Sequence, residues 1–131
     1  VATVQEIQQI NILHASMLAM QRAIEALPCT PERLLIDGNY YDPRPDEVEY
    51  HTIVKGDDRY LAIAAASILA KTHRDEYMTQ QAQEYPHYGW EQNKGYPTAQ
   101  HREGIRQHGS CPLHRQGFQL LQPESLFDLE R

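Results

Sequence analysis

Apolar residues recur at helical spacing in the first part of the chain. Over residues 5–27 they follow one another at steps of three and four, and they are Ile10, Leu13, Met17, Met20, Ile24 and Leu27. This spacing predicts a helix with one apolar stripe, ended by Pro28. Because the stripe spans few heptads and lacks flanking charge pairs, we expect it to pack on a sheet rather than to form a coiled coil.

Two short segments after this helix have the patterns of β-strands. Leu34-Leu35-Ile36 is an unbroken apolar run, which is typical of a strand buried on both faces. Residues 48–54 alternate well enough to form a second strand, and the proline-containing stretch 40–47 indicates a loop. A ribbon of two strands buries too little surface to be stable alone, so we expect further strands to complete the sheet.

A long helix is predicted over residues 57–82. Its segment Ile63-Ala-Ala-Ala-Ser-Ile-Leu-Ala70 is apolar on nearly every side, which predicts that the helix is enclosed. A loop punctuated by glycine and proline follows, and then a last helix over residues 99–108, which Thr98 can cap and Gly109 can end. The order helix, strand, strand, helix, loop, helix predicts an α/β fold with a small sheet.

The composition is that of a folded globular domain. Of 131 residues, 40% are hydrophobic and 23% are charged, which argues against disorder over the whole length. The formal net charge of −6 excludes binding to nucleic acid through bulk positive charge, because phosphate neutralisation needs lysine and arginine. Any contact with nucleic acid must therefore be local.

The cysteines and the hydropathy of the sequence indicate the cellular compartment that we expect for the protein. Cys29 and Cys111 lie far apart without a partner at zinc-ligand spacing, so neither a disulfide framework nor a structural zinc site is expected. No apolar stretch approaches the length of a membrane span, and no signal segment opens the chain. We therefore expect a cytoplasmic protein with no membrane partner.

Two aspartates stand where functional groups gather in α/β proteins. Asp37 follows the first strand, and ligand sites in open sheets lie outside the carboxyl ends of strands. Asp57 begins the long helix, and the oxygen donors of both residues suit Mg²⁺ or Mn²⁺. Simpler roles exist, since Asp37 can begin a turn and Asp57 or Asp58 can cap the helix. If Asp37 and Asp57 converge, their mutual repulsion favours a bound cation.

The loop Lys94-Gly95-Tyr96 combines a positive charge, a flexible backbone and an aromatic ring. Such elements hold phosphate and stack on a sugar or base, although a surface loop with a core-anchored tyrosine has the same composition. His114-Arg115 is either a phosphate contact or a solvated pair. The other histidines share no ligand spacing and are expected to be structural or exposed: His14, His51, His73, His87, His101 and His108.

A series of motifs in the same order resembles the ribonuclease HII family over nearly the whole chain. Residues 11–20 resemble its helix, and Leu35-Ile36-Asp37-Gly38-Asn39 resembles the strand that carries its third acidic residue. The strongest resemblance runs from Val54-Lys55-Gly56-Asp57 through Ile63–Lys71 to Arg74-Asp75 and contains the fourth. Later motifs continue it, and they are Tyr85-Pro86, Tyr88-Gly89, Lys94-Gly95-Tyr96-Pro97-Thr98, His101 and His114-Arg115 with Phe118.

This resemblance implies a ribonuclease H-like α/β fold, N-terminally truncated and with C-terminal helices. Residues 1–118 would form a partial catalytic domain, and residues 119–131 a C-terminal tail. The implied activity is that of an endoribonuclease that hydrolyses the RNA strand of RNA–DNA hybrids and cuts 5′ of ribonucleotides embedded in duplex DNA. The complete enzyme would be a monomer with Mn²⁺ or Mg²⁺ as its cofactor.

The same resemblance assigns roles to individual residues. Asp37 and Asp57 become catalytic metal ligands, and Tyr96 becomes the ring that packs at the RNA–DNA junction. The expected contacts to nucleic acid besides Tyr96 are Lys55, Lys94 and Arg115.

One part of the family pattern does not occur in this chain. The family begins with a strand that bears an Asp-Glu pair and with a Gly-Arg-Gly loop that reads the 2′-hydroxyl. Without this segment half of the carboxylate site is missing, so we expect a fragment that is nearly inactive alone. Two other functions stay open, namely a non-catalytic nucleic-acid-binding or assembly module that retains the fold, and another ribonuclease H-like nuclease without ribonucleotide preference.

Overall fold

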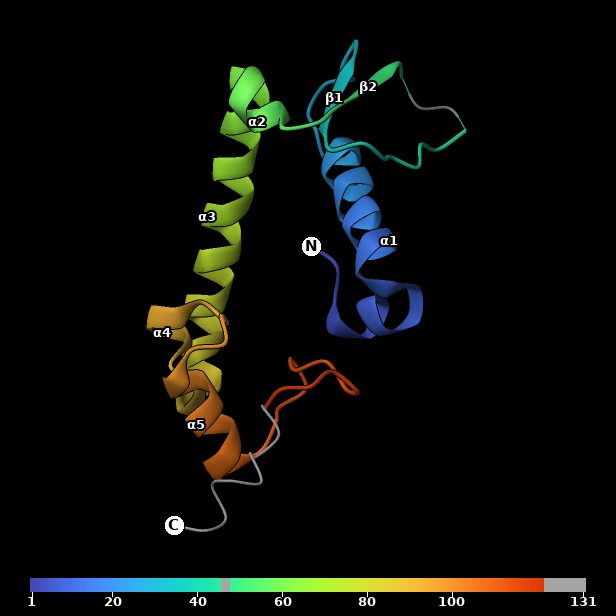
Figure 1. The fold of residues 1–131 in the computed structure, drawn as a ribbon. Helices are drawn as coiled ribbons and strands as arrows, with labels where there is room; N and C mark the ends of the chain where they lie inside the picture. Colours follow the sequence, from blue (N-terminus) through green and yellow to red (C-terminus); the bar gives the residue numbers. More distant parts are fainter. Residues whose placement is uncertain (46–47, 122–131) are drawn as a thin grey trace. The chain divides into compact units, whose positions relative to one another are not determined.

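The computed structural model describes residues 1–45 and 48–121 of the chain. It divides into two compact units that are described separately, unit 1 over Val1–Thr72 and unit 2 over His73–Arg131. The mixture of helices with a small parallel sheet confirms the α/β class (Figure 1). The elements in order are α1 (Val4–Glu25), β1 (Leu34–Asp37), β2 (Tyr50–Ile53), α2 (Gly56–Arg59), α3 (Leu61–Glu84), the 3-10 helix η1 (Pro86–Tyr88), α4 (Trp90–Asn93) and α5 (Ala99–His108).

Helix α1 is interrupted at Asn11, where the sequence pattern predicts a continuous helix. The backbone of Asn11 has φ 65° and ψ 172°, and its Oδ1 accepts hydrogen bonds from Leu13 N at 3.0 Å and His14 N at 3.2 Å. Asparagine tolerates a positive φ, and its short side chain can cap the helical segment that follows. The prediction of one unbroken helix was wrong for this reason.

The core of unit 1 lies between the second part of α1 and the sheet. Its buried residues are Met17, Leu34, Ile36 and Tyr41, with Met20, Ile24 and Val48 packed against them. The predicted apolar stripe is therefore confirmed at Met17, Met20 and Ile24. Its other members are exposed, namely Ile10, Leu13 and Leu27.

Strands β1 and β2 form a parallel pair in which Asp37 stands opposite Ile53. Leu34 and Ile36 are buried in the core with α1, whereas Leu35 between them is 36% exposed. Alternate burial means that the strand has one covered face, so the prediction that it is buried on both faces was wrong. Within residues 1–45 and 48–121, no third strand joins this sheet.

The helix predicted over residues 57–82 is divided into α2 and α3. Tyr60 separates them with an extended backbone, φ −130° and ψ 119°. Ile63 is buried, but other apolar side chains at the start of α3 are exposed, including Leu61 at 87% and Ile68 at 66%. The prediction of an enclosed helix was wrong for this structure, because the part of the chain that is described supplies no layer over this face.

The core of unit 2 surrounds Trp90, whose side chain is 2% exposed. Buried beside it are Ala82, Tyr88 and Ile105. The last helix begins and ends where the sequence predicts. Thr98 Oγ1 accepts a hydrogen bond from His101 N at 3.3 Å, and Gly109 follows the last residue of α5.

Helix α5 lies unusually close to η1. A Cβ added to Gly104 would stand 2.1 Å from the backbone oxygen of His87, well inside van der Waals contact. A residue without a side chain is therefore required at this position. The same close packing fixes the position of His101, which lies one turn earlier on α5.

Candidate functional site

Asp37 is the last residue of β1, and its side chain is exposed at the carboxyl end of that strand. Its Oδ1 accepts a hydrogen bond from Gly56 N at 2.8 Å. This bond joins the carboxylate to the start of α2 rather than to the backbone of its own turn. It therefore gives Asp37 a defined orientation toward a segment that lies far along the sequence.

Gly56 allows the end of β1 and the start of α2 to come together. It is buried, and a Cβ added to it would lie 2.6 Å from Ile63 Cδ1 and 3.4 Å from Asp37 Oδ1. Because Gly56 immediately precedes Asp57, its bond to Asp37 brings the backbones of the two aspartates into one neighbourhood of unit 1.

Asp57 lies in the first turn of α2 and is exposed. Its Oδ1 accepts a hydrogen bond from Asp58 N at 3.1 Å, which is a local contact with the helix backbone. Lys55, the residue that precedes α2, has a left-handed backbone with φ 53° and ψ 47°. Such a conformation is uncommon for a residue with a Cβ, so the backbone is strained two residues before Asp57.

The donor chemistry of the two aspartates fits a divalent cation. Carboxylate oxygens suit Mg²⁺ and Mn²⁺, and Mg²⁺ is commonly held by one or two carboxylates together with waters and substrate phosphates. Within the described ranges 1–45 and 48–121, no group of three or more histidine, cysteine, aspartate or glutamate side chains could hold an ion. Asp37 and Asp57 could thus supply part of a coordination sphere, which further ligands would complete.

Lys94 lies in unit 2 and is tied to neighbouring groups. Its Nζ donates hydrogen bonds to Thr79 Oγ1 at 2.7 Å and to the backbone oxygen of Glu91 at 2.6 Å. Its own backbone oxygen accepts a hydrogen bond from an Arg74 guanidinium nitrogen at 2.7 Å. In this arrangement the ammonium group anchors the loop that carries Tyr96.

The Tyr96 ring is 58% exposed, so the alternative in which it anchors the core is wrong. The Arg74 guanidinium carbon lies 5.4 Å from the ring centroid, close enough for a cation–π contact. The backbone of Tyr96 is held on both sides, because its N–H donates to the Asn93 backbone oxygen at 2.8 Å and its oxygen accepts from Thr98 N at 2.8 Å. A fixed backbone therefore presents an accessible ring.

His114 and Arg115 were predicted to act together as a phosphate contact or a solvated pair. His114 is 8% exposed, so neither role applies to its side chain in this structure. Arg115 is half-buried, and its guanidinium carbon lies 4.4 Å from the centroid of the Phe118 ring. The contact restrains the Arg115 side chain while leaving its charge in place.

Two histidines that show no common spacing in the sequence are in direct contact in the structure. His101 and His114 are buried, and their Nε2 atoms lie 3.0 Å apart, with Trp90 Nε1 donating to His101 Nε2 at 3.1 Å. Burial, and then the neighbouring His101, hold the pKa of His114 below its ordinary value. Periodicity cannot reveal a contact between residues on separate segments, but both histidines stand in the ordered motifs quoted above, and that was the available signal.

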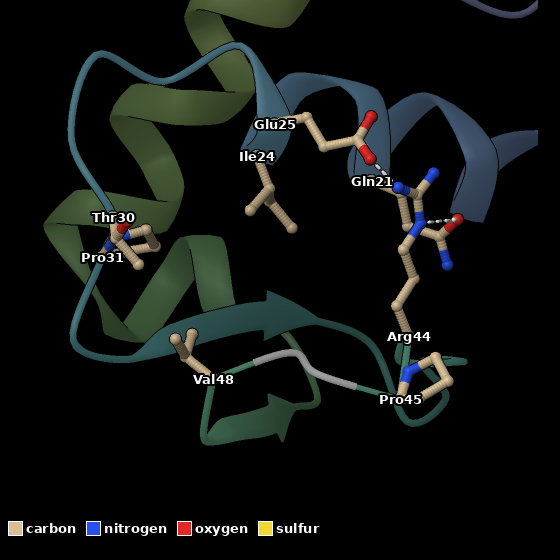
Figure 2. Close-up of a pocket in the computed structure, with 8 residues that line it drawn as sticks. All are labelled: Gln21, Ile24, Glu25, Thr30, Pro31, Arg44, Pro45 and Val48. Atoms are coloured by element: carbon tan, nitrogen blue, oxygen red, sulfur yellow. Dashed lines mark hydrogen bonds and ion pairs between the residues drawn. The ribbon is translucent and has the colours of Figure 1, made fainter.

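Unit 1 contains a cavity of about 320 Å³, and neither Asp37 nor Asp57 is among the residues that line it. Figure 2 shows Arg44 beside Gln21 and Glu25 at its edge, and Arg44 forms an ion pair with Glu25. The other lining residues are Ile24, Thr30, Pro31, Pro45 and Val48. The cavity therefore carries no part of the proposed metal chemistry.

The fold and the site together define a class of protein. It is an α/β protein with one aspartate at the carboxyl end of a parallel strand and a second on the short helix after the next strand. Residues 1–121 match the model of the family described as Ribonuclease HII, and the chain belongs to the ribonuclease HII family. The resemblance found in the sequence is thereby confirmed.

Curated relatives support the same assignment. The chain is 62% identical over 122 residues to "Ribonuclease HII" of Parabacteroides distasonis, which covers 93% of this chain and 60% of that relative. It is 54% identical over 121 residues to "Ribonuclease HII" of Bacteroides thetaiotaomicron, covering 92% and 60%. For "Ribonuclease HII" of Pelodictyon phaeoclathratiforme the identity is 59% over 116 residues, covering 88% and 56%.

The chain spans about 60% of the length of the curated relatives that it matches. Members of the ribonuclease HII family generally use divalent metal ions. Among the helices of the described residues, none combines the length with the apolar character that crossing a membrane requires.

Proposed function

We propose that this chain forms part of an endoribonuclease that hydrolyses the RNA strand of RNA–DNA hybrids and cuts 5′ of ribonucleotides embedded in duplex DNA. The observation that supports this most directly is the hydrogen bond from Gly56 N to Asp37 Oδ1, at 2.8 Å, beside Asp57. Asp37 and Asp57 are the proposed catalytic ligands of Mn²⁺ or Mg²⁺. Membership of the ribonuclease HII family supplies the substrate class.

The proposal also covers the domain boundaries, the oligomeric state, the cellular location and the substrate. Residues 1–118 form a partial catalytic domain with a ribonuclease H-like fold, and residues 119–131 form a tail, of which 122–131 lie outside the described residues. The complete enzyme is a cytoplasmic monomer. Its substrate is an RNA–DNA hybrid or a ribonucleotide-containing duplex DNA.

Each residue of the site has a distinct task in this proposal. A divalent cation, when bound, polarises the phosphoryl oxygen and stabilises the leaving oxygen. Gly56 orients Asp37 through its N–H, so that the carboxylate is fixed before substrate arrives. Tyr96 stacks on a sugar or base at the junction, and discrimination for RNA depends on the 2′-hydroxyl. The proposed phosphate contacts are Lys55, Lys94 and Arg115.

These contacts are local, as the charge of the chain requires. With a formal net charge of −6, the protein cannot attract nucleic acid by bulk charge. The Arg74 guanidinium over the Tyr96 ring adds a positive charge beside an aromatic surface. A cation next to an exposed ring is suited to a phosphate on one side and a base or sugar on the other.

The test uses a joined protein, in which this chain is linked to the part of the Parabacteroides distasonis relative that the match does not cover. We expect it to cut a duplex that contains one ribonucleotide when Mn²⁺ is present, and Asp37→Asn or Asp57→Asn to reduce the rate by about 10³-fold. The matched control is Asp58→Asn, which removes the neighbouring charge and should retain activity. Native rates in folded Asp37→Asn and Asp57→Asn variants would contradict the proposal.

A non-catalytic binding or assembly module is the second candidate, favoured by the finding that no described group of three or more ligand side chains could hold an ion. Titration of the 131-residue chain with Mn²⁺, followed by paramagnetic line broadening of backbone amides, separates the two. The nuclease proposal requires broadening at Asp37 and Asp57 that Asp37→Asn weakens. A module without a metal role predicts no broadening at either residue.

A further inference from the structure

His101 and His114 form a buried pair in unit 2 whose contacts allow one arrangement of hydrogens. Their Nε2 atoms are 3.0 Å apart, and the residues are 7% and 8% exposed. His101 Nδ1 lies 3.0 Å from the backbone oxygen of Tyr96, which can only accept, so Nδ1 carries a hydrogen. Trp90 Nε1 can only donate and lies 3.1 Å from His101 Nε2, so that atom carries none.

The hydrogen of His114 is fixed by the same argument. Its Nδ1 accepts a hydrogen bond from Cys111 N at 3.0 Å and lies 3.3 Å from Cys111 Sγ. The neutral ring must therefore carry its hydrogen on Nε2 and donate it to His101 Nε2. Both imidazoles are neutral in this arrangement, and His101 Nε2 is the acceptor shared by two donors, Trp90 Nε1–H and His114 Nε2–H.

An added proton cannot be accommodated without breaking a contact. A proton on His101 Nε2 would face the donors of Trp90 and His114. A proton on His114 Nδ1 would face the N–H of Cys111. Because an unmatched buried donor is costly, either event would loosen the segments that the pair joins.

Among the described residues, the other titratable groups that face the pair do not supply a compensating charge. The Tyr88 ring centroid lies 6.0 Å from that of His101 and 4.8 Å from that of His114, and Cys111 contributes its thiol. Burial raises the pKa of the Tyr88 phenol and of the Cys111 thiol, so both are neutral at and below neutral pH. Burial, and then His101, lower the pKa of His114, which favours its neutral form.

The histidine pair is hydrogen-bonded to the backbone of Tyr96, the residue whose ring is exposed. The Tyr96 oxygen is bonded to His101 Nδ1 at 3.0 Å and to Thr98 N at 2.8 Å, while the ring itself is 58% exposed. The charged groups beside this loop are Arg74 and Lys94, and they bond to backbone oxygens and a threonine hydroxyl. The histidine pair thus holds the same residue whose ring is offered to solvent.

We propose that the His101–His114 pair is a positioning element for Tyr96, which fixes the exposed residue for contact with nucleic acid only while the His114 imidazole is neutral. This inference rests on the proposed function, because the position of Tyr96 affects activity only if the ring contacts substrate. It makes recognition through Tyr96 fall at a pH below about 6.5, because burial and then His101 hold the pKa of His114 below that ordinary histidine value.

The first experiment follows Trp90, the single tryptophan of the chain, by fluorescence during a pH titration. In the 131-residue chain we expect a step below about pH 6.5, because the indole N–H is bonded to His101 Nε2, the atom that His114 also contacts. In His114→Gln the amide can donate to His101 but cannot take a proton, so the step should disappear or move to lower pH. The control His73→Gln changes an exposed histidine on α3 and should leave the step unchanged. An identical step in His114→Gln would overturn the proposal.

The second experiment separates the bond to Tyr96 from the rest of the pair. In His101→Asn the side-chain amide can still donate to the Tyr96 oxygen, as Nδ1 does. In His101→Gln the side-chain oxygen can replace Nε2 as the acceptor, but the hydrogen bond to the Tyr96 oxygen is lost. In the joined protein at about pH 8, where histidine is neutral, we measure the preference for a ribonucleotide-containing duplex over an all-DNA duplex.

The expected result is a fall in preference of about tenfold for His101→Gln, the order expected for one lost hydrogen bond, with His101→Asn retaining most of it. Equal preferences in both variants, whether native or reduced, would overturn the positioning role. Thermal melts followed by Trp90 fluorescence show whether each variant is folded at the assay temperature. If a His101 variant is unfolded, His114→Gln is measured at about pH 5.5 instead. We expect His114→Gln to retain the preference at this pH, where the unsubstituted protein loses it.

The two proposals fail in different ways. If Tyr96→Ala leaves the preference unchanged, the substrate contact assigned to Tyr96 is wrong, and the positioning role falls with it. If Tyr96→Ala lowers the preference but His101→Gln does not, the proposed function stands and the role of the histidine pair is overturned.

Discussion

The two aspartates of unit 1 are exposed to solvent, whereas the two paired histidines of unit 2 are buried. Asp37 and Asp57 are exposed, and the bond that orients Asp37 comes from the backbone of Gly56. His101 and His114 are buried, and throughout the described ranges every buried side-chain nitrogen or oxygen has a hydrogen-bond partner. Unit 1 therefore leaves its polar groups open to ligands, whereas unit 2 uses polar groups to hold its own backbone.

Among the described residues, the largest fully buried side chain lies in unit 2 and the most exposed large apolar side chain lies in unit 1. Trp90 in unit 2 is 2% exposed, while Leu61, Ile68 and Leu69 in unit 1 are 87%, 66% and 61% exposed. A closely packed region with a satisfied polar network loses more free energy from a single substitution than an open one. We therefore expect unit 2 to be the more sensitive of the two, and the following predictions test that difference.

The largest effect is expected from Gly104→Ala in unit 2. The added methyl group would lie 2.1 Å from the backbone oxygen of His87, and backbone cannot move aside as a flexible side chain can. We expect the free energy of unfolding to fall by about 3 kcal/mol. Urea denaturation followed by Trp90 fluorescence measures this change, and a loss below about 1 kcal/mol would mean that α5 and η1 are less tightly packed than described.

Gly56→Ala is the matched glycine substitution in unit 1. Here the new Cβ would lie 2.6 Å from Ile63 Cδ1, the end of a side chain that can rotate, so we expect a loss of about 1 kcal/mol. Relief of the clash with Ile63 would also move the Gly56 N–H that holds Asp37 Oδ1, and this should lower the cutting rate of the joined protein by about tenfold. A native cutting rate together with the loss of stability would show that the orientation of Asp37 by Gly56 does not matter for activity.

The fold could be predicted where its determinants are local. The stripe of Met17, Met20 and Ile24 and the cap at Thr98 follow from spacing and residue type alone. The breaks at Asn11 and Tyr60 could not, because each depends on the conformation of one residue inside an otherwise helical pattern. The exposure of the α3 face was also missed, since burial depends on what covers a helix and not on its own apolar content.

The site divides in a similar way. Sequence position and family resemblance selected Asp37 and Asp57 as candidates, but the bond that links Asp37 to Gly56 joins segments whose pairing is set by the parallel register of the strands. For Tyr96 the sequence left two alternatives open, a ring that contacts nucleic acid or a ring that anchors the core. The exposure of Tyr96 in the structure excludes the second. That Asp37 and Asp57 share one cation remains a proposal.

The two units should also lose stability in different pH ranges. Burial lowers the pKa of His114, so its contribution is full above about pH 6.5 and is lost as the pH falls below that value through the folded pKa. In unit 1, hydrogen bonds from Arg22 and then Thr3 lower the pKa of Glu6 from 4.5 to about 2, so its contribution is full above 4.5 and is lost as the pH falls through about 2.

Backbone amide spectra recorded from about pH 7 downward measure the order of these losses. We expect amides of unit 2 to change first, with His114→Gln suppressing the early change. Glu6→Gln should remove the later change in unit 1 and leave the early one intact. Changes that begin around Glu6 and Arg22 would reverse the predicted order.

The smallest effect is expected on the exposed face of α3 in unit 1. Ile68 is 66% exposed, so Ile68→Gln removes little buried surface and should change the stability of the 131-residue chain by less than about 0.5 kcal/mol. Ile63 lies on the same helix and is 7% exposed, so the control Ile63→Val should cost about 1 kcal/mol. Urea denaturation followed by circular dichroism measures both variants. A cost of about 2 kcal/mol or more for Ile68→Gln would mean that this face is covered in solution, and the contrast with the closed core of unit 2 would then no longer hold.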